Sequence, residues 1–371
     1  MKWLIQTSLC LMVLIMSASS CEKSLNMEDV TFTLALGIDL NSQGELIFYT
    51  TSPSFGKNVK VKSETFTTKS KTARQSRLEV DKRSLGLTLG SKLQVLLLGK
   101  RLLRDAKWFS ILDVLYRDSK STTSPIVIII DGPVSKIIHD SPASKPRMEL
   151  FLKSLISTAK LRGETVGTTV QELHRQMYEK GITPYLPRIK RKNQVIIAGS
   201  SLLNEKGRYT VSLTSHETTL LQILQNKKLD YSLTLPIFKN SKSHTAVKNM
   251  ISFNVQDVGT KIYTNYAHGK FQFKFHINLQ ILISEQLSPF KIGQDNVEFN
   301  QLIQRQLQVQ FQNLIKKIKK NKLDPVGLGL HARAYQYLEY KQIENKWGEA
   351  LSKADINIIV NSRIKTMGVI K

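Results

Sequence analysis

Apolar and polar residues follow one another along this 371-residue chain in patterns that predict short strands separated by helices. Residues 30–40 and 45–51 predict two strands joined by a turn. The apolar runs within 92–99 and 125–131 have the length and branching of strands buried on both faces. Between these runs, residues 102–118 carry apolar side chains at helical spacing. This alternation of strands and helices predicts an α/β domain.

Two further helices are predicted in the first half of the chain. The segment 57–77 is basic and rich in Ser and Thr, and residues 72–89 predict a helix that ends at Gly90. Thr169 and Glu172 have the spacing of a capping box, which predicts the start of another helix. Both helices would cover the predicted strands.

Two prolines and a basic segment follow that second helix. Pro184 and Pro187 interrupt the pattern, and residues 187–193 are strongly basic. Segments of this kind are typical of linkers, so we expect a domain boundary at residue 193.

The second half of the chain is mostly β in pattern, with residues 245–287 predicted as strands. Phe271, Phe273, Phe275 and Ile277 alternate with polar residues, which predicts a strand with one buried face. The remaining predicted elements are strands at 194–199, 209–213 and 354–365, a helix at 215–226 with Ser215 or His216 near its cap, a long amphipathic helix at 297–320, and a helix at 335–351. We predict no internal repeat.

These elements predict a mixed α/β and α+β fold with three distinct sheet-and-helix domains after a signal peptide. The expected divisions are a signal peptide at 1–20, an N-terminal α/β domain at 21–193, a small second α/β domain at 194–244, and a C-terminal α+β domain with the long amphipathic helix at 245–371.

The first 20 residues resemble a leader for export. Lys2 gives a positive start, an uncharged apolar run follows, and four small residues end at Ser20. Cys21 comes directly after them, as in a bacterial lipoprotein. We therefore predict diacylglyceryl transfer to the sulfur of Cys21 and cleavage between Ser20 and Cys21, and we leave N-acylation of Cys21 open.

Other interpretations of the leader remain open at this stage. The apolar run is shorter than the about 20 residues that a spanning helix needs. An ordinary secretory leader cut elsewhere would leave Cys21 without a role. If the leader is removed, Cys21 is the only cysteine left, so no disulfide is expected.

The chain is strongly basic, with a formal net charge of +25. Nucleic acid is the generic partner of such a charge, but an exported protein seldom meets DNA, so we expect no nucleic-acid partner. An anionic membrane surface fits better, because each Lys or Arg near it contributes about 1 kcal/mol. A solvated basic surface with no partner is the simplest alternative.

No catalytic, cofactor or metal motif is evident. The seven histidines include no HExxH pair, and His216-Glu217 stands alone. Residues 327–332 match the relaxed dinucleotide fingerprint only formally, because a predicted helix precedes them. Tyr335, Tyr337 and Tyr340 could form a stacking patch for nucleic acid, but we favour an ordinary packed face in which Leu338 lies with Tyr335 or with residues near Gln342. We predict a non-enzymatic protein with no cofactor or metal, although a carboxylate pair of a secreted cell-wall hydrolase stays open.

Several blocks of sequence, in their order and spacing, resemble one family over essentially the whole length. The blocks are Cys21 after the leader, Leu36-Gly-Ile-Asp39 with its hairpin, and the segments at 92–103, 112–118, 185–189, 198–224 and 347–365. The chain resembles the Ger(x)C family, the C subunits of spore germinant receptors.

The resemblance implies a three-domain lipoprotein on the outer face of the spore inner membrane. It would lie beside the integral membrane A and B subunits of a nutrient germinant receptor and would be required for spore germination, without enzymatic activity. The alternative kept open is an extracytoplasmic solute-binding lipoprotein of a transporter, which would need two similar lobes around a polar cleft.

Overall fold

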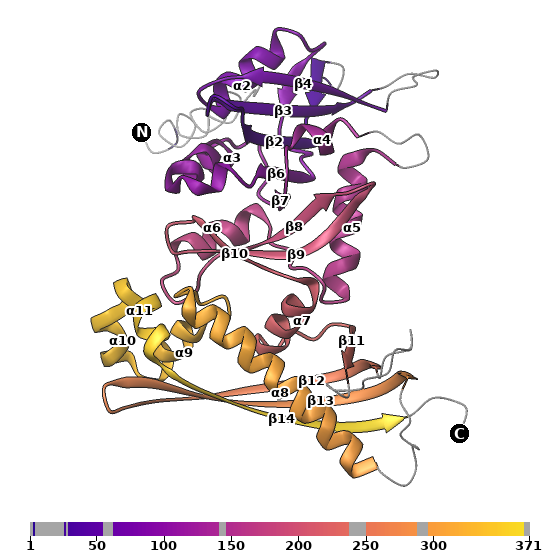
Figure 1. Cartoon of the computed structure of the whole chain (residues 1–371). Coiled ribbons are helices and arrows are strands. Elements are labelled where there is room, and N and C mark those ends of the chain that lie inside the picture. Colours follow the sequence, from indigo (N-terminus) through magenta and orange to yellow (C-terminus); the bar gives the residue numbers. More distant parts are fainter. Residues whose placement is uncertain are drawn as a thin grey trace.

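The computed structural model describes residues 29–54, 62–140, 146–236, 250–287 and 296–366, together with Trp3 and Asn26. These residues form an elongated molecule with strands and helices along its whole length (Figure 1). Its strands make a two-stranded sheet, an eight-stranded sheet and a four-stranded sheet. The predicted mixture of α/β and α+β structure is confirmed.

The eight-stranded sheet has parallel strands at its centre and antiparallel strands at both edges. Its order is β10-β9-β8-β7-β6-β2-β3-β4. The strands are β2 (Ala35–Leu40), β3 (Leu46–Pro53), β4 (Ser63–Lys69), β6 (Val95–Gly99), β7 (Ile126–Ile130), β8 (Tyr185–Arg191), β9 (Val195–Leu203) and β10 (Tyr209–Leu213). Strands β2, β6, β7 and β8 pair in parallel. Every residue of β6 and β7 is buried, as their uninterrupted apolar runs predict.

Helices and 3₁₀ turns cover both faces of this sheet. They are α2 (Ala73–Asp81), η2 (Leu102–Arg104), η3 (Ala106–Leu112), α3 (Asp113–Arg117), α4 (Ser135–Ile138), α5 (Met148–Leu161) and α6 (Val170–Tyr178). Separate apolar clusters lie on the two faces, one including Trp108 and the other including Leu152. The sequence analysis did not predict α4 or α5.

The predicted helix at 102–118 is mostly two 3₁₀ segments rather than an α-helix. Asp105 has extended backbone angles between them, and its side chain accepts a hydrogen bond from the Lys107 amide at 2.9 Å. Trp108 is buried, and its indole nitrogen donates to the carbonyl of Gly207 at 2.7 Å. This tertiary contact fixes the local path, and apolar spacing alone could not show it.

The predictions for residues 30–40 and 72–89 were correct in part. The first strand splits into β1 (Val30–Phe32) and β2, and helix α2 ends at Asp81. β1 pairs in parallel with β5 (Leu87–Leu89), which lies in the segment predicted to be helical. A Cβ on Gly86 would lie 2.6 Å from the backbone carbonyl carbon and oxygen of Asp29, so only glycine allows this close approach.

The basic segment at 187–193 is part of a hairpin. Strands β8 and β9 pair antiparallel, so the eight-stranded sheet continues across the boundary expected at residue 193. Pro187 lies inside β8, but the ladder with β7 begins at Arg188, where no proline nitrogen is needed as a donor. The boundary expected at residue 244 lies outside the described residues. The three-domain division stays a proposal.

The four-stranded sheet forms the other end of the molecule. Its order is β11-β12-β13-β14, with β11 (Tyr231–Pro236), β12 (Met250–Ala267), β13 (Lys270–Leu287) and β14 (Asp355–Thr366). The helices are α7 (Ser215–Leu224), α8 (Asn296–Lys320), α9 (Leu328–Tyr335), α10 (Tyr337–Ile343), η4 (Glu344–Lys346) and α11 (Trp347–Lys353). The alternating residues of β13 and the stripe of α8 meet in one core, as predicted.

The predicted helix at 335–351 breaks into α10, η4 and α11 after α9 has ended. Tyr340 is buried, but Tyr335, Tyr337 and Leu338 are exposed, so the expected packed face of Tyr335 and Leu338 was wrong. The cap of α7 is also one residue earlier than expected, because the side chain of Thr214 accepts from the Glu217 amide.

Candidate functional site

The predicted modification site lies outside the described residues. Neither Ser20 nor Cys21 is described, so lipidation and cleavage stay predictions. Strand β1 begins nine residues after Cys21 and lies beside β5. The first strand of the fold is therefore a short chain length from the predicted lipid.

The side chains that the sequence singled out as isolated make structural contacts. Nε2 of His216 lies 2.7 Å from Oε1 of Gln310, whereas Glu217 binds other groups. Across the described ranges, no three His, Cys, Asp or Glu side chains gather as a metal ion would require.

Asp324 is a carboxylate buried completely in the loop between α8 and α9. Its Oδ1 accepts hydrogen bonds from the amides of Gly327 at 2.8 Å and Leu328 at 2.9 Å. Its Oδ2 accepts from the amide of Gly329 and the indole nitrogen of Trp347, both at 2.7 Å. Burial raises the pKa of Asp324, and these four donors oppose that effect.

This arrangement explains the segment that resembles a dinucleotide fingerprint. The amides that would bind a phosphate at the start of α9 already bind Asp324. Gly327 has φ of +88°, a left-handed conformation that favours glycine. The loop therefore holds an internal carboxylate. Asp324 was not predicted from the sequence, although an Asp before Pro and Gly at a helix start is a recognisable turn signal.

The loop around Asp324, here called the Asp324 corner, joins the two halves of the molecule. One half is built on the eight-stranded sheet and the other on the four-stranded sheet. The carbonyl of Asp324 accepts from the Thr183 amide and its amide donates to the Thr183 hydroxyl, both at 2.8 Å. A Cβ on Gly329 would lie 2.7 Å from the Cα of Gly181. The chain between α6 and β8 therefore lies directly against the start of α9.

An ion pair strengthens the same junction. The guanidinium of Arg333 donates to both carboxylate oxygens of Glu179, at 2.9 and 3.1 Å. Burial raises the pKa of Glu179, but the hydrogen bonds from Arg333 and from the Gly181 amide, with the Arg333 charge, outweigh it and lower the net value.

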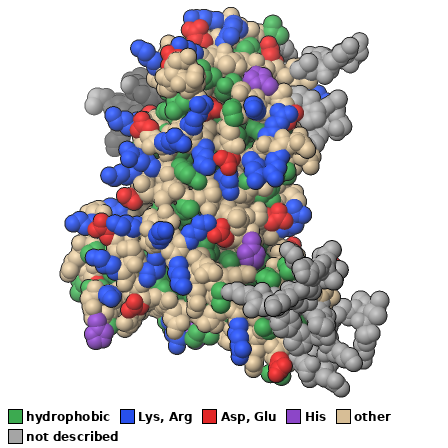
Figure 2. Space-filling view, viewed as in Figure 1, with side chains coloured by type: hydrophobic (Ala, Val, Ile, Leu, Met, Phe, Trp, Pro, Cys, Tyr) green, Lys and Arg blue, Asp and Glu red, His purple; other side chains and the backbone are tan. Residues whose placement is uncertain are grey.

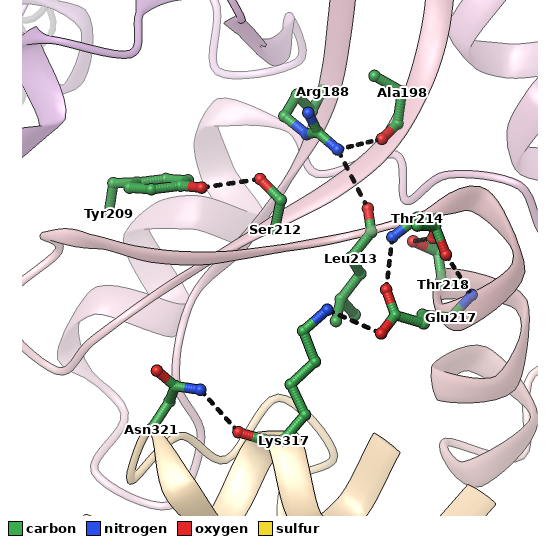
Figure 3. Close-up of polar contacts among 10 residues, drawn as sticks. All are labelled: Arg188, Ala198, Tyr209, Ser212, Leu213, Thr214, Glu217, Thr218, Lys317 and Asn321. Atoms are coloured by element: carbon green, nitrogen blue, oxygen red, sulfur yellow. Dashed lines mark hydrogen bonds and ion pairs between the residues drawn. The ribbon is translucent and has the colours of Figure 1, made fainter. Parts of the chain in front are cut away.

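A second polar contact crosses between α7 and α8 (Figure 3). Nζ of Lys317 lies 2.7 Å from Oε1 of Glu217, and the other oxygen of Glu217 accepts from the Thr214 amide at 2.8 Å. Burial raises the pKa of Glu217, but these donors and the Lys317 charge lower the net value. The capping box of α7 is thus tied to α8.

Arg188 holds the strands above this contact, as Figure 3 shows. Its guanidinium donates to the carbonyls of Ala198 and Leu213 and pairs with Asp131 at 2.9 Å. Apolar packing is continuous here too, because Leu202 and Leu213 of the eight-stranded sheet belong to the same core as α8 and β13. The two halves therefore share both polar and apolar contacts.

Two family models match consecutive parts of the chain. Residues 23–191 match the "Spore germination protein N-terminal domain" and residues 198–368 match "Spore germination B3/ GerAC like, C-terminal". The chain belongs to the Ger(x)C family. The gap between the two matches, residues 192–197, lies at the turn of the β8–β9 hairpin.

A curated relative and a solved structure agree with this membership. The chain is 23% identical to "Spore germination protein A3" of Bacillus subtilis (strain 168), over 97% of each chain. It matches the structure titled "Crystal Structure of the GerBC protein" with a TM-score of 0.56 and 16% identity, over 89% of this chain and 96% of that one. At this identity the structural match supports the fold alone.

Membership in the Ger(x)C family connects this chain with spore germination. The family is that of germinant-receptor C subunits, which are associated with other receptor subunits and with the spore membrane and are not known as enzymes. Among the described residues, no helix has both the length and the apolar character that crossing a bilayer requires.

Proposed function

We propose that this chain is a non-enzymatic subunit of a nutrient germinant receptor, anchored to the spore inner membrane by lipid on Cys21. The observation that carries the proposal is the family match over both halves of the chain, directly behind a lipoprotein-like leader. A lipid anchor with two acyl chains would hold the chain stably, where one chain is marginal.

This subunit would act by binding the integral membrane A and B subunits. The two halves are joined by the Asp324 corner and the Glu179–Arg333 pair, and the Glu217–Lys317 pair ties α7 to α8 within the second half. A body joined in this way is suited to presenting several surfaces to partners in one arrangement. The halves differ in architecture, which favours this function over a solute-binding protein with two similar lobes.

The basic surface would assist anchoring. Lys and Arg side chains are spread over the whole visible face, among fewer Asp and Glu (Figure 2), and the chain carries a net charge of +25. Attraction to an anionic bilayer acts within a Debye length of about 8 Å at physiological salt. It would supplement the lipid rather than replace it.

The anchoring test compares Cys21→Ser with Cys10→Ser, which changes the other cysteine of the leader. In spores, Cys21→Ser should release the chain from the membrane fraction at high salt and abolish incorporation of labelled palmitate, and Cys10→Ser should change neither. If Cys21→Ser stays on the membrane at high salt and germination is normal, the proposed anchor is wrong.

The contact test uses affinity-tagged chain in detergent-solubilised spore membranes. The A and B subunits should copurify with the tagged chain in stoichiometric amounts. Copurification of neither subunit, with the tagged chain intact and germination normal, would contradict the proposed role.

A further inference from the structure

Three exposed leucines lie along one short segment at the end of α2. The exposed fractions are 53% for Leu78, 104% for Leu85 and 52% for Leu87. Single exposed leucines are ordinary on protein surfaces. Three within ten residues concentrate exposed apolar surface on one segment, and such surface marks regions that contact another molecule.

Hydrogen bonds hold the segment at residues 80–88 in the conformation that exposes these side chains. The amides of Arg83 and Ser84 donate to the carbonyl of Val80, at 2.8 and 2.9 Å. The hydroxyl of Ser84 donates to the Gly86 carbonyl at 2.7 Å, and the carboxylate of Asp81 accepts from the Thr88 amide at 2.8 Å. The leucines are therefore exposed by a hydrogen-bonded turn.

The segment lies beside the first strand of the fold. Leu87 is the register partner of Val30 in the β1–β5 pair. Cys21 lies nine residues before Val30. An extended chain spans at most about 3.5 Å per residue, and paired strands lie about 5 Å apart, so the backbone of Cys21 can lie no farther than roughly 37 Å from Leu87.

Basic side chains flank the apolar ones. Lys82 and Arg83 directly precede the exposed turn, with Lys82 paired to Glu79 at 2.9 Å, and Lys71 and Arg74 lie exposed at the other end of α2. Apolar side chains flanked by Lys and Arg are the pattern of surfaces that bind at the interface of anionic bilayers.

We propose that the turn at residues 82–87, with Leu78, is the membrane-contacting edge of this protein, and that Leu85 inserts into an anionic bilayer beside the lipid anchor. This inference rests on the proposed anchorage at Cys21. A bilayer fits better than a protein groove because the tether keeps this edge within reach of lipid and because the flanking charges are basic.

The test uses the chain from residue 21 to residue 371, which contains every strand from β1 to β14 and all three apolar clusters. Cys21 is its only thiol, so it can be coupled to maleimide lipid in vesicles containing phosphatidylglycerol. Trp108 and Trp347 are buried, with 1% and 4% exposure. A Leu85→Trp variant therefore carries a single exposed tryptophan that reports contact with lipid.

The matched control is Leu338→Trp, at a position 72% exposed on α10. Figure 1 shows α10 and α2 at opposite ends of the molecule. On vesicles with brominated acyl chains, the Leu85→Trp fluorescence should be quenched at least threefold more than that of Leu338→Trp and shifted to the blue. In the Leu85→Trp variant, the further changes Lys82→Gln and Arg83→Gln should reduce the quenching by at least half. Replacing the anionic vesicles with phosphatidylcholine vesicles should have the same effect. Thermal unfolding confirms that each variant is folded.

Equal quenching at the two positions, or none at either, would overturn the proposal. If a Leu85→Ser, Leu87→Ser variant loses the A and B subunits on copurification while tethered Leu85→Trp shows no quenching, the segment is a protein-docking surface instead. The chemical coupling supplies the anchor, so this result does not depend on whether Cys21 is lipidated in the cell. Failure of the anchoring test and failure of this one are thus separate observations.

Discussion

Asp324 and Leu85 have solvent exposures opposite to those that their side chains favour. Asp324 is a carboxylate that is completely buried, and four donors surround it. Leu85 is an apolar side chain that is completely exposed in a turn held by hydrogen bonds. The first arrangement stabilises the junction of the two halves. The second does not lower the free energy of the isolated chain, and it is the position that we propose for contact with the bilayer.

The comparison predicts the largest loss of stability at Asp324. Asp324→Ala removes the acceptor of three amides and the Trp347 indole, and each buried donor left without a partner costs about 1–3 kcal/mol. We expect the free energy of unfolding in urea to fall by about 4 kcal/mol or more. Asp324→Asn, which keeps the shape, should cost less than Asp324→Ala. An equal effect from Asp257→Ala, at a half-exposed carboxylate, would contradict the special role of the corner.

Gly329→Ala should give the next largest effect. The added methyl group would lie 2.7 Å from the Cα of Gly181 and 2.8 Å from Nε1 of Trp347, so the backbone must shift. Overpacking of this kind costs about 2–3 kcal/mol. The control is Gly259→Ala in β12, where nothing lies within 4 Å of the added atom. Calorimetry that shows equal melting temperatures for the two variants would mean that the close approach does not matter.

Glu217→Gln should have a smaller effect that depends on pH. It removes the pair with Lys317 and weakens the capping box, for about 1 kcal/mol at pH 7. Because folding lowers the pKa of Glu217, its stabilisation is complete above the unfolded value of about 4.3 and is lost as the pH falls through the folded value. The parent should therefore lose stability more steeply than Glu217→Gln in acid. If the free energy of unfolding depends on pH in the same way in both proteins, the Glu217–Lys317 pair does not contribute to stability. Glu339→Gln serves as the control.

Leu85→Ser should have the smallest effect on the isolated chain. Because the side chain is already exposed, the free energy of unfolding should change by less than about 0.5 kcal/mol. Leu351→Ser, at a buried position, should instead cost several kcal/mol. A large loss from Leu85→Ser would show that the leucine packs within the chain, which would remove the contrast with Asp324.

The elements that were predicted correctly are those in which the order of apolar and polar residues shows directly which side chains are buried. The apolar runs of β6 and β7, the alternation in β13 and the stripe of α8 were all confirmed. Each pattern reflects contact with one continuous apolar layer, which periodicity reports directly.

The errors come from contacts between distant residues. The helix predicted through residue 89 gives way to β5 because β1 lies beside it, and the helix predicted at 102–118 changes form because Trp108 reaches Gly207. The turn at Asp324 could be recognised from its Pro and Gly neighbours, but its complete burial was missed because that burial depends on Thr183 and Trp347, which are distant in the sequence. Local pattern contains no information about such partners.

The position of β14 also has a consequence for how the chain is made. This strand ends at residue 366, yet it pairs in parallel with β13, which ends at residue 287. Synthesis at roughly 5–20 residues per second leaves the edge of β13 without its neighbour for on the order of ten seconds. During that time a long strand rich in Phe and Ile has an open ladder, the kind of edge that pairs with other chains. The four-stranded sheet is therefore completed only when the last described strand of the chain has joined it.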